Sequence, residues 1–406
     1  MNILFLTMNT FTSIEMHNIY SELMKEFIVN GHRPYIVTPR EKRRNEETEL
    51  VNFEDYSILK VKIGNTSDVS LIEKGISTVT LNSKFRRAIR NHLGNIQFGL
   101  ILYSTPPITI ASTVGKLKEY YKCQTYLMLK DIFPQNAVDL GMMGKGGILH
   151  RYFRSKEKQL YNNSDTIGCM SQGNVDYLLS HNNYIDARRV EMCPNAISPK
   201  PIPNKDIARE QIRQKYNIPN DAVIFMYGGN LGKPQGIPFL VEVLRRMKDV
   251  PDSFFIICGS GSEYELVADF ITKQHPQNII LNKELPKEEY DDLLAGCDIG
   301  MLFLDYRFTI PNYPSRMLSY MEQQMPIISF TDVASDVGKT IEGGSFGWSR
   351  SSNDVNEAVE LISNVQKNRV LIREYGINAR RYLENYFSVN VPYARIMKAV
   401  KNGGNQ

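Results

Sequence analysis

The stretch from Tyr227 to Gly236, Tyr-Gly-Gly-Asn-Leu-Gly-Lys-Pro-Gln-Gly, combines four glycines with a lysine and could bind an anion. A buried-strand pattern at residues 222–226 precedes it, and a helical apolar pattern at residues 237–247 follows it. A glycine-rich turn between a strand and a helix exposes backbone N–H groups at the positive end of the helix, which suits a phosphate. A turn that only packs the helix is the simpler alternative. The residues of the turn expected to contact phosphate are Gly229, Asn230 and Lys233.

The glycine spacing differs from the two common nucleotide-binding fingerprints. It is not G-x-G-x-x-G, and it lacks the Gly-Lys-Ser/Thr ending of a P-loop. The turn lies in the middle of the chain, so a nucleotide-binding half would come second, whereas the dinucleotide fold of a dehydrogenase usually comes first. This order favours a two-domain transferase over a dehydrogenase.

The length of 406 residues is too great for one hydrophobic core and predicts two domains of about 200 residues. Residues 192–203 contain four prolines and indicate an extended linker between the domains. We therefore expect one domain at 1–195 and a second at 196–385. A terminal helix at 386–406 is expected to pack back on the first domain.

Strand and helix patterns alternate in both halves, which predicts an α/β protein with two Rossmann-like parallel sheets and C-terminal helices. Ligands bind such sheets at the carboxyl ends of the strands, so the two domains are expected to face a cleft. Residues 40–49 are highly charged and predict a mobile surface loop. The expected strands are 3–7, 33–38, 100–104, 125–129, 222–226, 254–258, 278–281, 299–304 and 326–330, and the expected helices include 14–29, 108–121 and a continuous helical tail at 355–400.

Composition excludes several classes of protein. The net charge of +4 is too small for a nucleic-acid-binding protein, and no apolar run is long enough to span a membrane. The five cysteines are scattered without a C-x-x-C or Cys/His cluster, which predicts reduced thiols in a cytoplasmic protein and no metal site.

One segment carries a local basic excess, with seven Lys or Arg and one acid between Asn82 and Lys122. Residues 83–93 within it predict a basic amphipathic helix with Phe85, Ile89 and Leu93 on its apolar face. Such a helix can lie in an anionic membrane surface. Packing of the same face against the first domain is an equally good interpretation.

Several segments, taken in order along the chain, resemble the family-4 retaining glycosyltransferases of the GT-B fold. The turn at Tyr227–Gly236 resembles the phosphate-binding turn of that family, and Cys193-Pro194-Asn195-Ala196-Ile197 resembles its inter-domain segment. The other segments that carry the resemblance are 30–37, 258–262, Asp298 at the start of a strand, and 325–328.

Two further segments are similar to loops of bacterial O-antigen and capsule transferases, nearest to the L-fucosamine (N-acetyl-L-fucosamine) transferases. These are Leu129–Ala137, with Lys-Asp-Ile-Phe-Pro, and Ile310–Tyr320, with Pro-Asn-Tyr-Pro-Ser-Arg. The resemblance implies a UDP-sugar donor, bound by a nucleotide-sugar-binding domain at 196–385, and a lipid-diphosphate-linked saccharide acceptor, bound by an acceptor-binding domain at 1–195. It also implies a peripheral place on the anionic inner face of the membrane and no cofactor or metal.

The chain departs from the family at two glutamates that face the donor sugar and the ribose, since Pro311 and Ser319 stand at their positions. The resemblance therefore implies that the loop around Arg316 supplies amides, a hydroxyl and a cation to the diphosphate, while Ser319 bonds a ribose hydroxyl. A salt bridge at a helix start is the alternative role of Arg316. The donor-binding residues expected here are Asn312, Tyr313, Ser315, Arg316 and Ser319.

Other polar residues are expected at the carboxyl ends of strands. Asp131 follows a strand and precedes Pro134, so it could bind sugar or orient the acceptor, although a turn or helix-cap role is the alternative. Lys130 is a candidate for the diphosphate, and His17 for the acceptor. Gly261 and Glu263 are expected near the nucleotide, although Glu263 could equally cap a helix.

Two alternatives from other classes remain open at this stage. With both glutamates absent, the chain could be a non-catalytic partner that binds a UDP-sugar. It could also be a UDP-sugar 2-epimerase, although the sequence shows no set of carboxylates for that chemistry.

Overall fold

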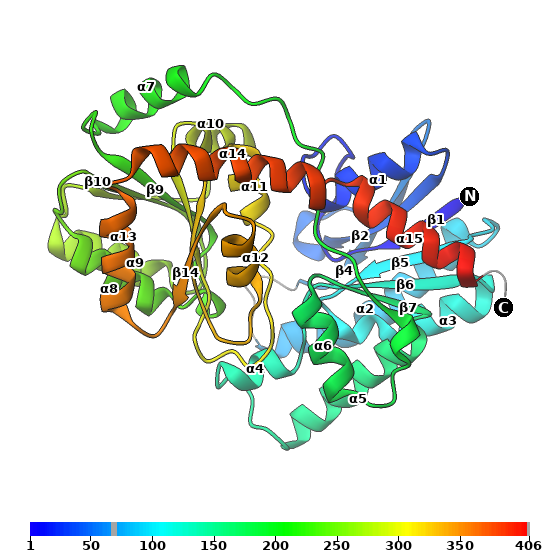
Figure 1. Ribbon diagram of the computed structural model, residues 1–406. Helices are drawn as coiled ribbons and strands as arrows, with labels where there is room; N and C mark the ends of the chain where they lie inside the picture. The colour runs from blue at the N-terminus through cyan, green and yellow to red at the C-terminus, as the bar shows by residue number, and fades with distance from the viewer. Residues whose placement is uncertain (66–70, 404–406) are drawn as a thin grey trace. The chain divides into compact units, whose positions relative to one another are not determined.

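The computed structural model describes the backbone of residues 1–65 and 71–403, and the side chains of these residues outside 71–79. The chain forms two compact units (Figure 1). The first unit contains Met1–Ile197 and Val389–Gln406, and the second contains Ser198–Ser388. The sequence placed these boundaries after residues 195 and 385.

The first unit is built on an eight-stranded sheet in the order β3-β4-β2-β1-β5-β6-β7-β8. All neighbouring strands are parallel except β3 and β4, which are antiparallel. Its strands are β1 (Asn2–Leu6), β2 (Arg33–Glu41), β3 (Glu49–Asn52), β4 (Ser57–Ile63), β5 (Leu100–Ser104), β6 (Gln124–Leu129), β7 (Thr166–Cys169) and β8 (Val190–Met192). Its helices are α1 (Ile19–Val29), α2 (Leu71–Leu93), α3 (Ala111–Tyr121), α4 (Gln135–Asp139), α5 (Ile148–Asn163), α6 (Gln172–His181) and α15 (Asn390–Gly403), with 3-10 turns η1 (Lys42–Arg44), η2 (Ile108–Ile110) and η3 (Ala187–Arg189).

The second unit has a six-stranded, all-parallel sheet in the order β11-β10-β9-β12-β13-β14. Its strands are β9 (Val223–Asn230), β10 (Ser253–Ser260), β11 (Ile279–Asn282), β12 (Ile299–Phe303), β13 (Ile327–Thr331) and β14 (Gly347–Ser351). Its helices are α7 (Lys205–Tyr216), α8 (Ile237–Met247), α9 (Tyr264–Gln274), α10 (Lys287–Ala295), α11 (Met317–Glu322), α12 (Val337–Gly343), α13 (Val355–Val365) and α14 (Arg369–Tyr386), with the 3-10 turn η4 (Lys233–Gln235). The predicted architecture of two parallel-sheet, Rossmann-like units with C-terminal helices is confirmed.

Each sheet is stabilised by a buried apolar layer beneath its helices. In the second unit, α8, α9 and α13 cover one face of the sheet (Figure 1), and their apolar side chains pack on strand residues such as Phe225 and Phe255. In the first unit, α15 lies beside α1, where the rings of Phe27 and Tyr393 are 5.4 Å apart. The last helix of the chain is therefore part of the first unit.

Three local predictions were wrong. The first helix begins at Ile19, because the Asn18 side chain accepts hydrogen bonds from the N–H groups of Tyr20 and Ser21 and starts the helix there. The predicted loop at 40–49 instead contains the end of β2, the turn η1 and the first residue of β3. The tail is interrupted at 366–368 and 387–389, so it forms three helices.

The apolar stripe of the predicted basic helix is buried in the first unit. Phe85, Ile89 and Leu93 lie in the last turns of α2 and are 1%, 0% and 1% exposed. The stripe therefore packs against the protein and is not available to a membrane. No helix among the described residues combines the length and apolar character needed to cross a bilayer.

Candidate functional site

The glycine turn of the second unit lies at the carboxyl ends of β9 and β10. Gly229 has a φ of +114°, in the region that favours glycine. A Cβ on Gly259, its partner in β10, would lie 1.8 Å from the Gly229 carbonyl oxygen. Glycine at both positions therefore lets the two strand ends approach closely and leaves their backbone open to a ligand.

Arg316, immediately before α11, reaches this turn. Its guanidinium carbon lies 3.5 Å from the position that a Cβ on Gly229 would take, and 4.8 Å from the centre of the Tyr227 ring. Its Nη1 atom is buried and has no hydrogen-bond partner in the protein. A buried guanidinium nitrogen without a partner is costly unless a ligand satisfies it, and a phosphate oxygen would do so.

Buried tyrosines hold the backbone beneath this guanidinium. The Gly228 N–H donates to the hydroxyl of Tyr320 at 3.0 Å, and that hydroxyl donates to the Met301 carbonyl at 3.3 Å. The Tyr290 hydroxyl occupies the space that a Cβ on Gly228 would need. Burial raises the pKa of Tyr290 and Tyr320, so both stay protonated and neutral near pH 7.

The rest of the predicted turn is held by its own side chains. The Asn230 amide donates to the Gln235 side-chain oxygen at 2.8 Å, so Asn230 shapes the turn. Lys233 is exposed on η4, where its ammonium can move toward an anion. Gly236 has a φ of +58° and packs against the backbone of Asp305.

Gly261 and Glu263 lie beside the same turn. A Cβ on Gly261 would lie 2.4 Å from the Leu231 carbonyl oxygen, and that oxygen accepts a hydrogen bond from the Glu263 N–H at 2.8 Å. The Glu263 Oε2 atom is buried without a hydrogen-bond partner. Burial raises the pKa of Glu263 and the nearby charge of Lys233 opposes that shift. Glu263 thus offers a second polar atom that a ligand could satisfy.

The loop before α11 is attached to the loop after β13. The Asn312 N–H donates to the Ser335 hydroxyl at 2.9 Å, and that hydroxyl donates to Asp332 at 2.8 Å. Tyr313 is only 8% exposed, with its ring 6.1 Å from Phe387, so it offers a ligand little surface. Ser315 is exposed and Ser319 is partly exposed, three residues after Arg316 on the same helix start.

In the first unit, Asp131 lies at the carboxyl end of β6. The N–H groups of Lys130 and Asp131 both donate to the Thr105 hydroxyl, at 3.0 and 3.3 Å. Both carboxylate oxygens of Asp131 accept from the Asn136 amide, at 2.9 and 2.8 Å. Burial raises the pKa of Asp131 to about 6, although these hydrogen bonds oppose the shift. Asp131 can therefore exchange a proton near neutral pH.

The other two first-unit candidates have protein neighbours of their own. Burial lowers the pKa of Lys130, whose ammonium is close enough to Cys169 and Cys193 to interact with them electrostatically. His17 precedes α1, and its Nδ1 atom lies 3.2 Å from a carboxylate oxygen of the buried Glu22. The contact with Glu22 restricts the orientation of the His17 ring.

Sequence reasoning missed several residues of the second-unit site. Tyr290 comes from α10. After β12, the Arg307 guanidinium donates two hydrogen bonds to Asp305, at 2.8 and 2.7 Å. The position of Asp305 at a strand's carboxyl end was a usable signal. No signal in the sequence pointed to Tyr290, because a tyrosine in an ordinary helical pattern does not indicate which part of the backbone it will cover.

Among the described residues, no group of three or more His, Cys, Asp or Glu side chains is placed to hold a metal ion.

Comparisons with known proteins show similarity to glycosyltransferases. Residues 208–382 match the family described as "Glycosyl transferases group 1". The chain is 23% identical over 367 residues to "Probable glycosyltransferase WbjE" of Pseudomonas aeruginosa, covering 87% of this chain and 85% of the relative. It is 24% identical over 212 residues to WcaI of Escherichia coli K12, proposed to be a colanic acid biosynthesis glycosyl transferase, covering 49% and 48% of the two chains.

Solved structures share the fold over nearly the whole length. Sucrose-phosphate synthase from Thermosynechococcus elongatus superposes with a TM-score of 0.78 at 14% identity, covering 99% of this chain and 98% of that one. Anabaena Alr3699/HepE in complex with UDP and glucose superposes with a TM-score of 0.70 at 12% identity, covering 98% and 99%.

The two parallel-sheet, Rossmann-like units have the GT-B architecture. The family match and the relatives indicate that the protein is a glycosyltransferase. The residues that match the family lie within the second unit.

Proposed function

We propose that the protein transfers an N-acetylated amino-deoxy sugar from a UDP donor to a lipid-diphosphate-linked saccharide, with retention of configuration. N-acetyl-L-fucosamine is the first candidate for the sugar. The product would enter a bacterial surface polysaccharide such as an O-antigen or a capsule. The description of WcaI as a colanic acid transferase supports this setting, and the complex of Alr3699/HepE with UDP and glucose supports the choice of nucleotide.

One observation carries the proposal: the guanidinium of Arg316 lies against Gly229 with its buried Nη1 atom unpartnered. A diphosphate placed there would receive hydrogen bonds from Arg316 and from backbone N–H groups of the turn, with the exposed Lys233 closing over it. These groups stabilise the negative charge that develops on the leaving UDP, which is the main electrostatic demand of the reaction.

The chemical step follows from that arrangement. The acceptor hydroxyl oxygen bonds to the anomeric carbon, the bond from that carbon to the diphosphate oxygen breaks, and its electron pair remains on UDP. The hydroxyl proton passes to the leaving phosphate oxygen. Asp131 and His17 are proposed to orient the acceptor, and Lys130 to add positive charge toward the diphosphate. No step requires a metal ion, because Arg316 and Lys233 supply the positive charge.

Glu263 is proposed to take the place of the missing ribose glutamate. Ser319 offers only a neutral hydroxyl, whereas a carboxylate accepts hydrogen bonds from ribose hydroxyls more strongly. The unpartnered Oε2 of Glu263 beside the glycine turn has the chemistry required.

An enzyme that uses a lipid-linked acceptor must contact an anionic membrane. The apolar face of the predicted basic helix is buried, but the first unit has another exposed surface that suits this contact. Met142 before α5 and Ile148 and Leu149 at its start are 63%, 91% and 55% exposed, and Lys145 and Arg151 are close to them in sequence. Exposed apolar side chains with adjacent cations suit a bilayer of anionic lipid.

The membrane contact is tested by sedimentation with vesicles that contain phosphatidylglycerol. An Ile148→Glu/Leu149→Glu variant is expected to lose binding, whereas Val370→Glu, an equally exposed apolar residue of the second unit, retains it. Equal binding by both variants would exclude this surface.

The transfer activity is tested by incubating the protein with UDP-N-acetyl-L-fucosamine and a lipid-diphosphate-linked saccharide, followed by mass spectrometry of the lipid product. Growth of the acceptor by one sugar with release of UDP is expected. Binding of the donor without turnover would indicate a non-catalytic partner. Conversion of the donor to an epimer without acceptor would indicate a 2-epimerase.

A further inference from the structure

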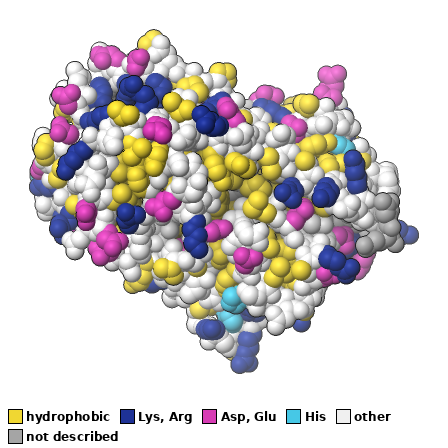
Figure 2. All heavy atoms as spheres, in the orientation of Figure 1, with side chains coloured by type: hydrophobic (Ala, Val, Ile, Leu, Met, Phe, Trp, Pro, Cys, Tyr) yellow, Lys and Arg dark blue, Asp and Glu magenta, His cyan; other side chains and the backbone are white. Residues whose placement is uncertain are grey.

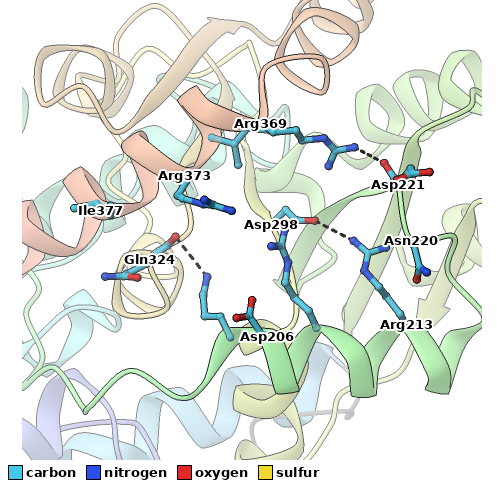
Figure 3. Close-up of a pocket in the computed structure, with 12 residues that line it drawn as sticks. Asp206, Arg213, Asn220, Asp221, Asp298, Gln324, Arg369, Arg373 and Ile377 are labelled. Carbon is cyan, nitrogen blue, oxygen red and sulfur yellow. Dashed lines mark hydrogen bonds and ion pairs between the residues drawn. The ribbon is translucent and has the colours of Figure 1, made fainter.

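A cavity of about 740 Å³ lies between α7 and α14 of the second unit (Figure 3). Two short segments complete its wall, one before β9 at Asn220 and Asp221, and one before β12 at Asp298. These segments precede their strands, so the cavity is at the amino ends of the sheet. Because the glycine turn and Arg316 lie at the carboxyl ends, the cavity is separate from the proposed donor site.

The cavity is rich in positive charge. Five cationic side chains line it against three acidic ones, and Figure 2 shows Lys and Arg gathered on the surface over α7 and the start of α14. The cations are Lys205, Arg209, Arg213, Arg369 and Arg373, and the acids are Asp206, Asp221 and Asp298.

The most buried of the three acids is already engaged. Asp298 is paired with Arg209 and lies 3.8 Å from Arg213, and it also accepts a hydrogen bond from the Ile224 N–H at 2.8 Å. A network of this kind would be enough to explain Arg209 and Arg213 as structural residues.

The other three cations are not neutralised in this way. Arg369 donates to the backbone carbonyl of Asp221, and Lys205 makes one long contact of 3.5 Å to the Gln324 carbonyl (Figure 3). No described residue forms a hydrogen bond or ion pair with Arg373, which points into the cavity.

The cations also repel one another. Burial, followed by the charge of Arg209, lowers the pKa of Lys205 to about 8. Burial lowers the pKa of Arg209 as well, followed by the charges of Arg369 and Arg373. A bound anion would relieve this repulsion.

We propose that this cavity binds a phosphoryl anion with two or more negative charges, such as a diphosphate group. Several guanidinium groups around one cavity suit phosphate oxygens, which accept paired N–H donors from arginine. Inorganic diphosphate, a nucleotide and a sugar phosphate share this chemistry, and binding measurements distinguish these sources.

The cavity is connected to the proposed donor site through α11. Arg316 stands at the beginning of this six-residue helix, and Gln324, whose carbonyl contacts Lys205, follows its end. At the same end, Glu322 accepts from the Lys200 N–H at 2.8 Å, and Arg380 of α14 donates to the Glu322 carbonyl at 3.0 Å. An anion that draws Lys205 and α14 together would therefore shift α11 and change donor affinity. The effect of the anion on donor affinity rests on the proposed function, whereas anion binding in the cavity does not.

The test is calorimetric titration with inorganic diphosphate, ADP and glucose 1-phosphate, with no UDP added because UDP carries the same diphosphate group. Arg369→Gln/Arg373→Gln is expected to weaken binding of the preferred anion at least tenfold. The matched control, Lys367→Gln/Arg381→Gln, removes two exposed charges from the same region outside the cavity and is expected to bind as the unmodified protein does.

Equal affinity in both variants, or no binding by any of the three anions, would overturn the proposal. The Arg316→Gln variant separates the two sites. It is expected to keep anion binding in the cavity while its affinity for UDP falls. If the proposed donor site is wrong, the affinity of the cavity for anions can therefore still be measured.

Discussion

The guanidinium of Arg316 lies over the face of the Tyr227 ring, with its central carbon 4.8 Å from the ring centre. A cation held by an aromatic face keeps its full charge, whereas one held by a carboxylate is neutralised. A desolvated contact of this kind stabilises the cation by about 2 kcal/mol. The Tyr227 hydroxyl also donates to the Asn230 carbonyl at 2.7 Å, so the same residue supports the glycine turn. The arrangement positions a positive group for a diphosphate without a competing acid.

The close approach of β9 and β10 predicts a strict requirement for glycine at position 259. Gly259→Ala would place a Cβ 1.8 Å from the Gly229 carbonyl oxygen, so the strand ends must separate. We expect a loss of about 1–3 kcal/mol in the free energy of unfolding, together with weaker UDP binding. Urea denaturation measures the first and calorimetry the second.

Gly343→Ala is the matched control, because a Cβ on Gly343 of α12 meets nothing within 4 Å. It is expected to leave stability equal or higher, since alanine favours a helix. Equal stability of the two variants would show that the strand ends tolerate a side chain.

The unpartnered carboxylate oxygen of Glu263 predicts a role in recognising ribose. Glu263→Gln is expected to weaken binding of UDP about tenfold, since hydrogen bonds to charged groups are worth about 1.5–3 kcal/mol. Binding of 2′,3′-dideoxy-UDP is expected to change little, because that nucleotide lacks the hydroxyls. Glu265→Gln, on the exposed surface of the same helix, serves as control. An equal loss for both nucleotides would contradict the assignment.

The raised pKa of Asp131 predicts a dependence on pH. If the ionised carboxylate orients the acceptor, kcat/KM rises as pH increases through about 6, the folded-state pKa. Asp131→Asn is expected to remove this rise. An unchanged pH profile in that variant would exclude the role.

The same pKa predicts the sign of a stability effect. The carboxyl group has a higher pKa when folded than its usual 3.8, so folding favours its protonated form. Relative to Asp131→Asn, the unmodified protein is therefore expected to lose stability as pH rises from about 4 to about 6, with no further change above that. Urea denaturation at pH 4, 5, 6 and 7.5 provides the measurement.

Much of the fold could be predicted because the strands are short apolar runs between turns. The prediction for 100–104 coincides with β5, and most other strands differ at their ends by a few residues. β9 is the informative exception. Its apolar run stops at Tyr227, yet the strand continues to Asn230, because Gly229 faces Gly259 of β10 and the two backbones stay paired. Long-range pairing of this kind leaves no signal in the local pattern.

The candidate site was predictable only in part, for a similar reason. The turn and Arg316 were both expected at the diphosphate, but their contact at Gly229 depends on how α11 is folded against β9. The apolar stripe of Phe85, Ile89 and Leu93 was predicted, but what covers it was not. Its spacing indicates which face of the helix is apolar, but either a membrane or the protein could cover that face.

The measurement that tests the central claim most directly is calorimetric titration of UDP into the unmodified protein, Arg316→Gln and Arg350→Gln. Arg350 is an exposed arginine of the second unit outside the proposed site. We predict that UDP binds the unmodified protein and Arg350→Gln alike, and Arg316→Gln at least tenfold more weakly, in line with the loss of charged hydrogen bonds. Failure of UDP to bind the unmodified protein, or equal binding by all three, would contradict the assignment of the Gly229 turn and Arg316 as the diphosphate site.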